Sequence, residues 1–131
     1  QIIPGIKSGD DLLLPDGRVV PNAELTTAAA PPRSYAFCSD TAPTDAVAEA
    51  VQGVDLLYHE ATFTSEHLEE ARISFHTTAA QAAEIARRAG VRRLLLGHIS
   101  GRYETEETHL AEARAIFEHT DMAVEGQPVE I

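Results

Sequence analysis

The 131-residue sequence has no tryptophan, a single cysteine and few aromatic side chains, which make up 5% of the residues. A lone cysteine, Cys38, cannot form an internal disulfide, so we expect a protein of a reducing compartment, the cytoplasm. With so few aromatic rings, the core must be built mainly from alanine, valine, leucine and isoleucine. A chain of this length can form one domain with a modest core, or part of a larger one.

Long apolar runs and secretory features are absent as well. No stretch approaches the roughly 20 apolar residues of a transmembrane helix, so we expect no membrane association. The N-terminal sequence, QIIPGIKSGDD, has no basic region followed by an apolar stretch, so we expect no secretory signal. The first residue is Gln1 rather than Met, which is consistent with a piece of a longer protein.

Positive charge is also scarce, since 10 basic residues stand against 21 acidic ones and the formal net charge is -11. Proteins bind nucleic acids largely through Lys and Arg side chains that contact phosphates. Taken by itself, this balance argues against a nucleic-acid partner.

The order of the expected elements is that of an α/β protein, in which short apolar strands alternate with helices. We interpret residues 1–33 as a short hairpin followed by a connecting segment, and residues 34–131 as the α/β part. Strands are expected at 34–39, 54–58 and 92–97, and helices are expected to begin near Pro43, at the capping box Thr78–Gln81 and near Thr105. Two more short strands, at 121–125 and 128–131, are expected around Gly126.

Polar side chains stand where three of these strands end: Asp40 after the first, His59 and Glu60 after the second, and His98 after the third. His76 comes just ahead of the helix that starts at Thr78. In α/β sheets, ligands bind beyond the carboxyl ends of the strands. We therefore expect Asp40, Glu60, His76 and His98 to converge on one edge of the sheet.

Each of these residues also has an ordinary structural interpretation. An Asp after a strand is typical of a turn or a helix cap, and an isolated His is more often a hydrogen-bonded structural residue than a ligand. Glu60 can cap the following segment, and Ser100 and Arg102 fit an ordinary loop. Three further histidines lie in polar helical surroundings and are assigned to solvated faces: His67, His109 and His119.

The combination of Asp40 and His98 at neighbouring strand ends suits Zn²⁺ or Mn²⁺. A His beside a Glu, as in the pair His76 and Glu60, suits a proton donor oriented by a carboxylate. Two metal ligands are too few for a zinc site, however, which takes three or four protein ligands. The chain thus carries about half of a metal site.

Four motifs together resemble the C-terminal half of ribonuclease Z, the tRNA 3′-processing endonuclease family of the metallo-β-lactamase superfamily. They are SDT (39–41), HEATF (59–63), HTT (76–78) and GHISGRY (97–103). The resemblance covers nearly the whole chain and implies an α/β fold, the C-terminal half of an αββα sandwich. The family's H-x-H-x-D-H metal motif lies in an N-terminal half that this sequence does not contain.

The resemblance also implies a role for each matching position. Asp40 and His98 match zinc ligands of a complete site that holds two Zn²⁺ ions. Glu60 and His76 match a pair that either protonates the leaving 3′ oxygen or stabilises charge on the scissile phosphate. Positions along the substrate path are matched by Ser100, Arg102, Thr77 and the neighbouring Thr62.

The implied function is zinc-dependent removal of the 3′ trailer from precursor tRNA, by a chain that is inactive without the N-terminal half. The implied partners are precursor tRNA, that N-terminal half and a second copy in a homodimer. In this family much of the RNA affinity belongs to an arm in the missing half, so the acidic composition does not exclude RNA if Arg92, Arg93 and Arg102 contact it locally. Two alternatives stay open: another metallo-hydrolase of the superfamily, and an inactive half-domain that only associates.

Overall fold

The structure is a computed structural model that describes residues 2–131, and it divides into a smaller unit that ends at Pro32 and a larger unit, Arg33–Ile131. The smaller unit contains α1 (Ile2–Ser8), β1 (Leu12–Leu13), β2 (Val19–Val20) and α2 (Asn22–Leu25). The two strands pair antiparallel across the turn expected at residues 15–17, where Gly17 adopts a φ of +86°. The sequence predicts neither α1 nor α2, and α2 lies in the segment interpreted as a connection.

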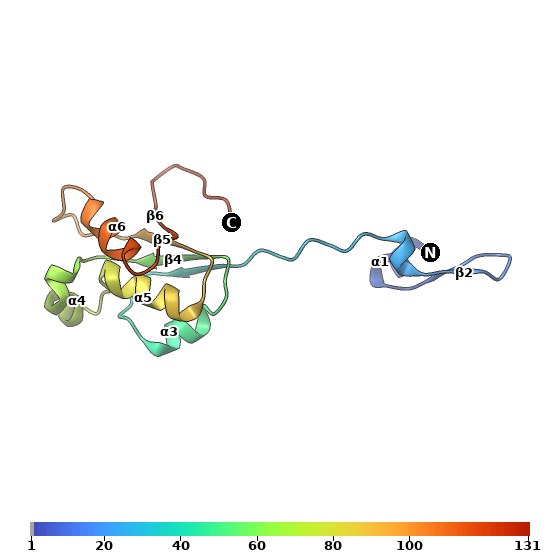
Figure 1. The fold of residues 1–131 in the computed structure, drawn as a ribbon, viewed down its shortest axis with the longest axis horizontal. Helices are drawn as coiled ribbons and strands as arrows, with labels where there is room; N and C mark the ends of the chain where they lie inside the picture. The colour runs from blue at the N-terminus through green and yellow to red at the C-terminus, as the bar shows by residue number, and fades with distance from the viewer. Residues whose placement is uncertain (1) are drawn as a thin grey trace. The chain divides into compact units, whose positions relative to one another are not determined.

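The larger unit is built on a four-stranded sheet in the order β3-β4-β5-β6, with every neighbouring pair parallel (Figure 1). Its strands are β3 (Tyr35–Cys38), β4 (Leu56–Glu60), β5 (Arg93–Gly97) and β6 (Thr120–Met122). Its helices are α3 (Asp45–Ala50), the short 3-10 helix η1 (Ser65–His67), α4 (Leu68–Ser74), α5 (Ala79–Ala89) and α6 (Glu107–Arg114). Because the strands are parallel, their carboxyl ends all lie at one edge.

The helix α5 is bounded by the signals that predict it. The Thr78 side chain accepts a hydrogen bond from the Gln81 amide, and the Gln81 side chain accepts one from the Thr78 amide. At the other end Gly90 adopts the left-handed conformation, with a φ of +63°, that commonly terminates helices. This reciprocal cap places the start of α5 directly after His76 and Thr77.

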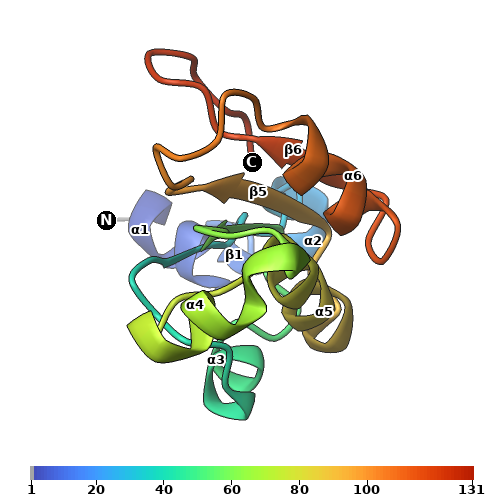
Figure 2. The same cartoon turned by 90° about the vertical axis from the view of Figure 1, so that its left-hand side faces the viewer.

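The core lies between the sheet and the helices, and Figures 1 and 2 show α3 and α5 on the same side of β4 and β5. Leu57, Leu94 and Leu96 point to this side and are fully buried. Burial of each leucine side chain contributes about 1.5–3 kcal/mol. The inward face of α5 is almost all alanine, so the helix packs close to the sheet.

The opposite face of the sheet is only partly covered. Leu95 is buried and lines a hollow with residues of the C-terminal segment, which runs over this side (Figures 1 and 2). Tyr35 and Phe37 on β3 are 49% and 62% exposed, and the Phe37 ring stacks on Tyr58 with centroids 4.5 Å apart. An apolar strip on β3 and β4 therefore faces outward in the described chain.

Two expectations from the sequence are wrong. The strands expected at 121–125 and 128–131 do not pair with each other, because β6 instead pairs with the free edge of β5 and residues 128–131 form no strand. His109, expected on a solvated face, is fully buried, and its ring meets that of Tyr103 edge-on with centroids 4.5 Å apart. His109 precedes the buried Ala113 by four residues, so both lie on the inward side of α6.

None of the helices among residues 2–131 is both long and apolar enough to cross a membrane.

The burial of His109 generates a prediction about stability. Burial lowers the pKa of His109 and outweighs the nearby carboxylates of Glu112 and Glu106, which raise it. As the pH falls through about 6.5, the unfolded chain gains a proton that the folded chain excludes, so the free energy of unfolding decreases. His109→Phe should weaken this decrease between about pH 7 and pH 5 without loss of stability at pH 8. Urea unfolding across this range tests it, and an unchanged pH dependence would contradict it.

Candidate functional site

Three of the expected residues, Asp40, His76 and His98, lie close together at the carboxyl ends of the strands. Asp40 follows β3 and His98 follows β5, and His98 Nε2 lies 3.3 Å from Asp40 Oδ1. His76 lies next to them, with its ring centroid 5.4 Å from that of His98. One ligand atom of each of these three residues lies within 4.8 Å of the others. The predicted convergence on one edge of the sheet is present.

Glu60 occupies the centre of the site and is fully buried. Its carboxylate accepts four hydrogen bonds of 2.6–3.1 Å, from the Thr41 amide, the Thr62 hydroxyl, the Thr77 amide and His76 Nδ1. Burial alone would raise the pKa of Glu60, but these hydrogen bonds outweigh it and hold the pKa below its ordinary value. Glu60 is therefore a buried negative charge.

The Thr62 hydroxyl determines how His98 presents its ring. This hydroxyl donates to Glu60 Oε2 at 2.6 Å and lies 2.9 Å from His98 Nδ1. Because its one proton points to the carboxylate, the hydroxyl accepts from His98, whose Nδ1 carries the hydrogen. The lone pair of His98 is thus on Nε2, the atom that faces Asp40, as a metal ligand requires.

His76 is oriented in a similar way by Glu60. Its Nδ1 donates to Glu60 Oε1 at 2.8 Å, and its side chain is 23% exposed while that of Glu60 is not exposed at all. The Nε2 atom remains free to donate a proton or to bind a metal ion. The geometry of this pair suits the acid–base role and the ligand role equally.

Three residues around the site adopt positive φ values without being glycine. They are Asp40 (φ +51°), Phe75 (φ +60°) and His98 (φ +56°). No other non-glycine residue within residues 2–131 has a positive φ. Such conformations cluster at functional sites, because the surrounding structure must compensate for their strain. At Asp40 and His98 the chain leaves the strand abruptly, which turns both side chains toward one point.

The loop that follows His98 is fastened to the end of β4. The Ser100 amide donates to the Thr62 carbonyl at 3.1 Å, and the Tyr103 hydroxyl lies 3.0 Å from both the Thr64 amide and His67 Nδ1. Arg102 is exposed and its guanidinium lies over the Phe63 ring, 4.9 Å from the centroid. Ser100 and Arg102 thus lie near the site, and their contact with a substrate stays a prediction.

Thr77 is too deeply buried to make the expected contact with a substrate. Its side chain is fully buried, its hydroxyl donates to the Thr41 carbonyl at 2.6 Å, and its amide donates to Glu60. Thr77 therefore supports the site from beneath. The sequence predicts Thr62 only as a position along the substrate path. Its bridging role could have been inferred, because residues two apart in an extended segment, such as Glu60 and Thr62, lie on the same side.

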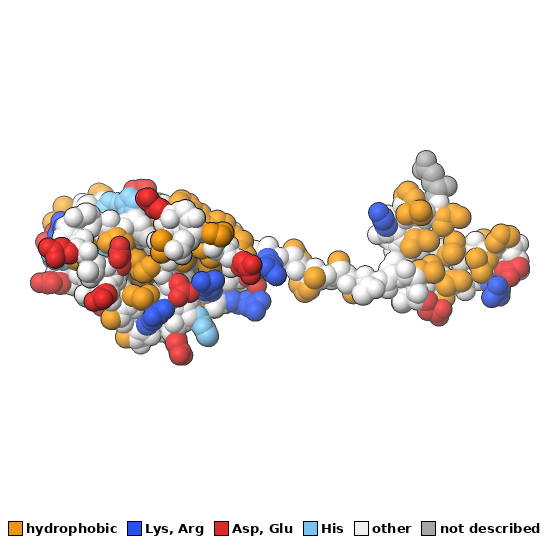
Figure 3. All heavy atoms as spheres, turned by 90° about the horizontal axis from the view of Figure 1, so that it is seen from above, with side chains coloured by type: hydrophobic (Ala, Val, Ile, Leu, Met, Phe, Trp, Pro, Cys, Tyr) orange, Lys and Arg blue, Asp and Glu red, His pale blue; other side chains and the backbone are white. Residues whose placement is uncertain are grey.

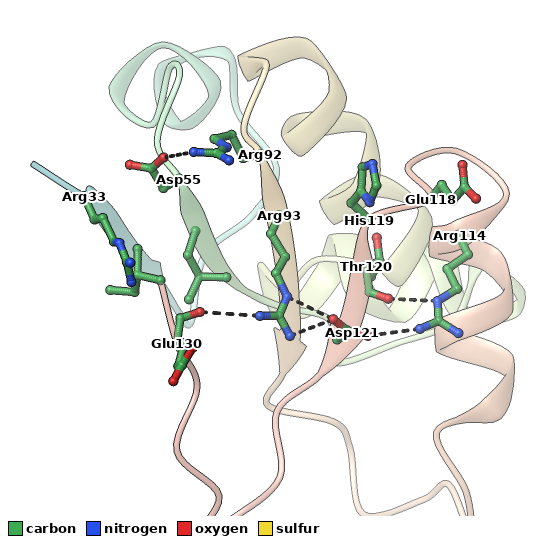
Figure 4. Close-up of a pocket in the computed structure, with 12 residues that line it drawn as sticks. Arg33, Asp55, Arg92, Arg93, Arg114, Glu118, His119, Thr120, Asp121 and Glu130 are labelled. Carbon is green, nitrogen blue, oxygen red and sulfur yellow. Dashed lines mark hydrogen bonds and ion pairs between the residues drawn. The ribbon is translucent and has the colours of Figure 1, made fainter. Parts of the chain in front are cut away.

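The arginines expected to compensate for the acidic composition lie elsewhere. Arg93 begins β5 and pairs in register with Leu56 at the start of β4, so Arg92 and Arg93 are at the edge opposite the site. They line an open cavity of about 790 Å³, where Arg92 pairs with Asp55 and Arg93 with Asp121 (Figure 4). On the face in Figure 3, basic side chains gather mainly toward one end of the larger unit, whereas acidic ones are spread widely. Arg92 and Arg93 thus lie away from this site, and their contact with RNA stays a prediction.

Comparisons with known proteins agree with this architecture. Residues 21–99 match the family described as the Beta-lactamase superfamily domain. The solved structure of the metallo-β-lactamase fold protein YhfI from Bacillus subtilis resembles the chain with a TM-score of 0.64 and 24% identity, over 70% of this chain and 37% of that one. These findings confirm the predicted fold class.

Curated relatives named Ribonuclease Z match almost the whole chain. The one from Porphyromonas gingivalis is 50% identical over 128 residues, which are 98% of this chain and 42% of the relative. The one from Bacteroides fragilis is 52% identical over 121 residues, which are 92% of this chain and 40% of the relative. The chain thus spans about two fifths of the length of these relatives, in their C-terminal part, and the resemblance drawn from the four motifs is confirmed.

The bridging role of Thr62 is testable by Thr62→Val, which removes the hydroxyl and keeps the shape of the side chain. His98 Nδ1 then loses its partner, so we expect zinc affinity in the full-length protein to fall by roughly 10- to 100-fold. Glu60 also loses one donor, so the free energy of unfolding should fall by about 1–3 kcal/mol. Isothermal titration with zinc and urea unfolding measure the two effects. Thr62→Ser, which retains the hydroxyl, is the matched control, and unaltered zinc affinity in Thr62→Val would contradict the assignment.

Proposed function

The chain belongs to the β-lactamase superfamily, and we propose that it is the C-terminal part of a zinc-dependent endoribonuclease that removes the 3′ trailer from precursor tRNA. The observation that carries the proposal is the buried Glu60 carboxylate, which orients His76 beside Asp40 and His98. The name Ribonuclease Z, given to relatives about half identical to the chain, supports the choice of substrate. A tRNA substrate and the lone Cys38 both favour the cytoplasm as the place of action.

The side chains at the site fit a bound metal ion. Asp40 and His98 offer a carboxylate oxygen and an imidazole nitrogen, the donor types that Zn²⁺ takes, and His98 presents its lone pair on the side of Asp40. We propose that they hold zinc in a site for two ions, with the remaining ligands supplied by the N-terminal half. When bound, zinc lowers the pKa of water and neutralises charge on a phosphodiester.

Residues of this chain protonate the leaving group. The Glu60 carboxylate accepts from His76 Nδ1 at 2.8 Å and so orients the imidazole ring. His76 donates the Nε2 proton to the 3′ oxygen as its bond to phosphorus breaks, so that the departing group leaves as a neutral hydroxyl. The product is a tRNA with a free 3′ hydroxyl.

The position of His76 also permits a competing assignment. One of its ring nitrogens belongs to the same ligand-sized cluster as Asp40 and His98. A carboxylate that accepts from Nδ1 of a metal-bound histidine is common around zinc sites, so Glu60 would then serve as the support of a third ligand. Metal content distinguishes the two assignments, because only a ligand is required for metal binding.

In the full-length protein, His76→Ala should leave the zinc content unchanged and lower the rate of precursor tRNA cleavage by roughly 10²- to 10⁴-fold. Glu60→Gln should lower the rate less, because it disturbs the orientation and charge of His76 but leaves the proton donor in place. The double variant should be little slower than His76→Ala, since the two residues act as a unit. Single-turnover kinetics and elemental analysis of each variant measure these effects.

The outcomes separate the assignments clearly. Loss of zinc in His76→Ala would make His76 a ligand and would overturn its role as the acid. His98→Ala is the positive control, since it should lose zinc and most of the activity together. A full-length wild-type protein that binds zinc but does not cleave precursor tRNA would overturn the proposed function and favour another hydrolase of the superfamily.

We also propose that the N-terminal half of the same protein covers the exposed strip on β3 and β4, and that the complete protein is a homodimer. The strip is apolar, with Phe37 62% exposed, and such surfaces usually mark interfaces. An isolated chain of these 131 residues should therefore self-associate and bind zinc weakly, because most ligands are absent.

Light scattering of the purified 131-residue chain tests this association. The apparent molar mass should rise with concentration, and Phe37→Lys should suppress that rise because it places a charge in the strip. Ile116→Lys alters another exposed apolar residue, which follows α6, and is the matched control. A chain that stays monomeric at high concentration would contradict the proposed cover.

A further inference from the structure

An apolar hollow lies beside the site and shares one residue with it. The hollow has a volume of about 590 Å³ and is formed by α4, by residues 42–43 and by Gln81 of α5. His76 lines the hollow and also belongs to the cluster with Asp40 and His98, so the hollow adjoins the residue proposed to protonate the leaving oxygen. Neither the metal cluster nor the acid–base pair accounts for this hollow.

Phe75 is the unusual residue of the hollow. It directly precedes His76, it is 73% exposed, and it ends α4 in the left-handed conformation with a φ of +60°. Glycine is the usual residue at such a helix end, and bulky residues rarely adopt this conformation. The ring contributes little to the core, because most of its surface is exposed. An exposed, strained aromatic side chain next to a proposed catalytic residue indicates a binding role.

The charges around the hollow favour a flat neutral group over a phosphate. Arg72, the basic residue in its lining, already pairs with Glu69 at 3.1 Å. Glu70 adds another negative charge to the first turn of α4. A phosphate in the hollow would therefore be repelled. The apolar side chains of Leu68, Ile73 and Phe75 suit the face of a nucleobase.

We propose that this hollow binds a nucleobase of the RNA next to the scissile bond, with the base stacked on Phe75. The proposal rests on the proposed function and extends it, because it assigns part of the substrate contact to this chain. A nucleotide whose phosphate lies at His76 can place its base in the adjoining hollow. Single-stranded nucleotides are commonly held by such stacking on aromatic side chains, which is insensitive to sequence.

The test uses the full-length protein and precursor RNAs in which one nucleotide at a time beside the cleavage site is replaced by an abasic nucleotide. For the wild type, one abasic position should lower the cleavage efficiency by roughly 5- to 100-fold, the usual range for a lost stacking contact. Phe75→Leu, which stays apolar but lacks the aromatic face, should show a similar loss on intact RNA. It should show almost no further loss on that abasic RNA, since the contact is already gone.

Two variants of Phe75 and one control exclude a folding defect. Phe75→Tyr keeps the aromatic face and should cleave like the wild type. Phe75→Gly suits the left-handed conformation and should melt no lower than the wild type, yet it should cleave as poorly as Phe75→Leu. Ile116→Ala removes an exposed apolar side chain from another part of the surface and should respond to abasic RNA like the wild type. Zinc content should be equal in all of them.

The failures are distinguishable from one another. If the wild type cleaves RNA but Phe75→Leu loses as much as the wild type on every abasic RNA, the nucleobase assignment is overturned and the proposed function stands. If Phe75→Leu changes the molar mass measured by light scattering, the hollow belongs to a contact between two copies and the assignment is again overturned. A wild type that cleaves no RNA removes the proposed function, and this inference with it.

Discussion

The site depends on one buried charge, the carboxylate of Glu60. It is fully buried, and the hydrogen bonds that it accepts come from three separate segments, those around Thr41, Thr62 and His76–Thr77. An unpaired charge in this place would be costly, so the segments must close around it together. The hydrogen bonds that stabilise the buried charge thus also fix the loop after β3, the segment after β4 and the segment before α5.

That dependence explains how the candidate metal ligands are held in place although they lie outside the core. Asp40 and His98 are exposed, yet His98 is held through the Thr62 hydroxyl, which is itself held by Glu60. Two consecutive hydrogen bonds therefore connect the buried Glu60 carboxylate to the exposed His98 imidazole and fix the orientation of its ring. Groups oriented in this way need little rearrangement to bind a ligand, which is how a preorganised site gains affinity.

The parts of the fold that could be predicted are those with strong local signals. The leucines of β5 and the capping box at Thr78 each identify an element by composition or by paired side chains. The rule that parallel strands collect ligands at their carboxyl ends then locates the site. The left-handed conformations at Asp40 and His98 could not be predicted, because no glycine indicates them. The burial of His109 could have been predicted from its spacing of four residues to Ala113, but its polar side chain favoured a solvated face.

The distribution of charge implies that bound metal ions in the proposed enzyme would also attract the RNA substrate. Arg92 and Arg93 are at the opposite edge of the sheet and paired, while Asp40 and Glu60 place negative charge at the site. Arg102, which lies near the site, offsets only part of this negative charge, so without bound metal ions the site favours a phosphodiester poorly. Bound zinc would reverse the sign of the local field, so that the ions determine whether RNA can approach at all, as well as whether it is cleaved. On this account an acidic chain is compatible with a polyanionic substrate, because bound metal ions would supply positive charge at the site.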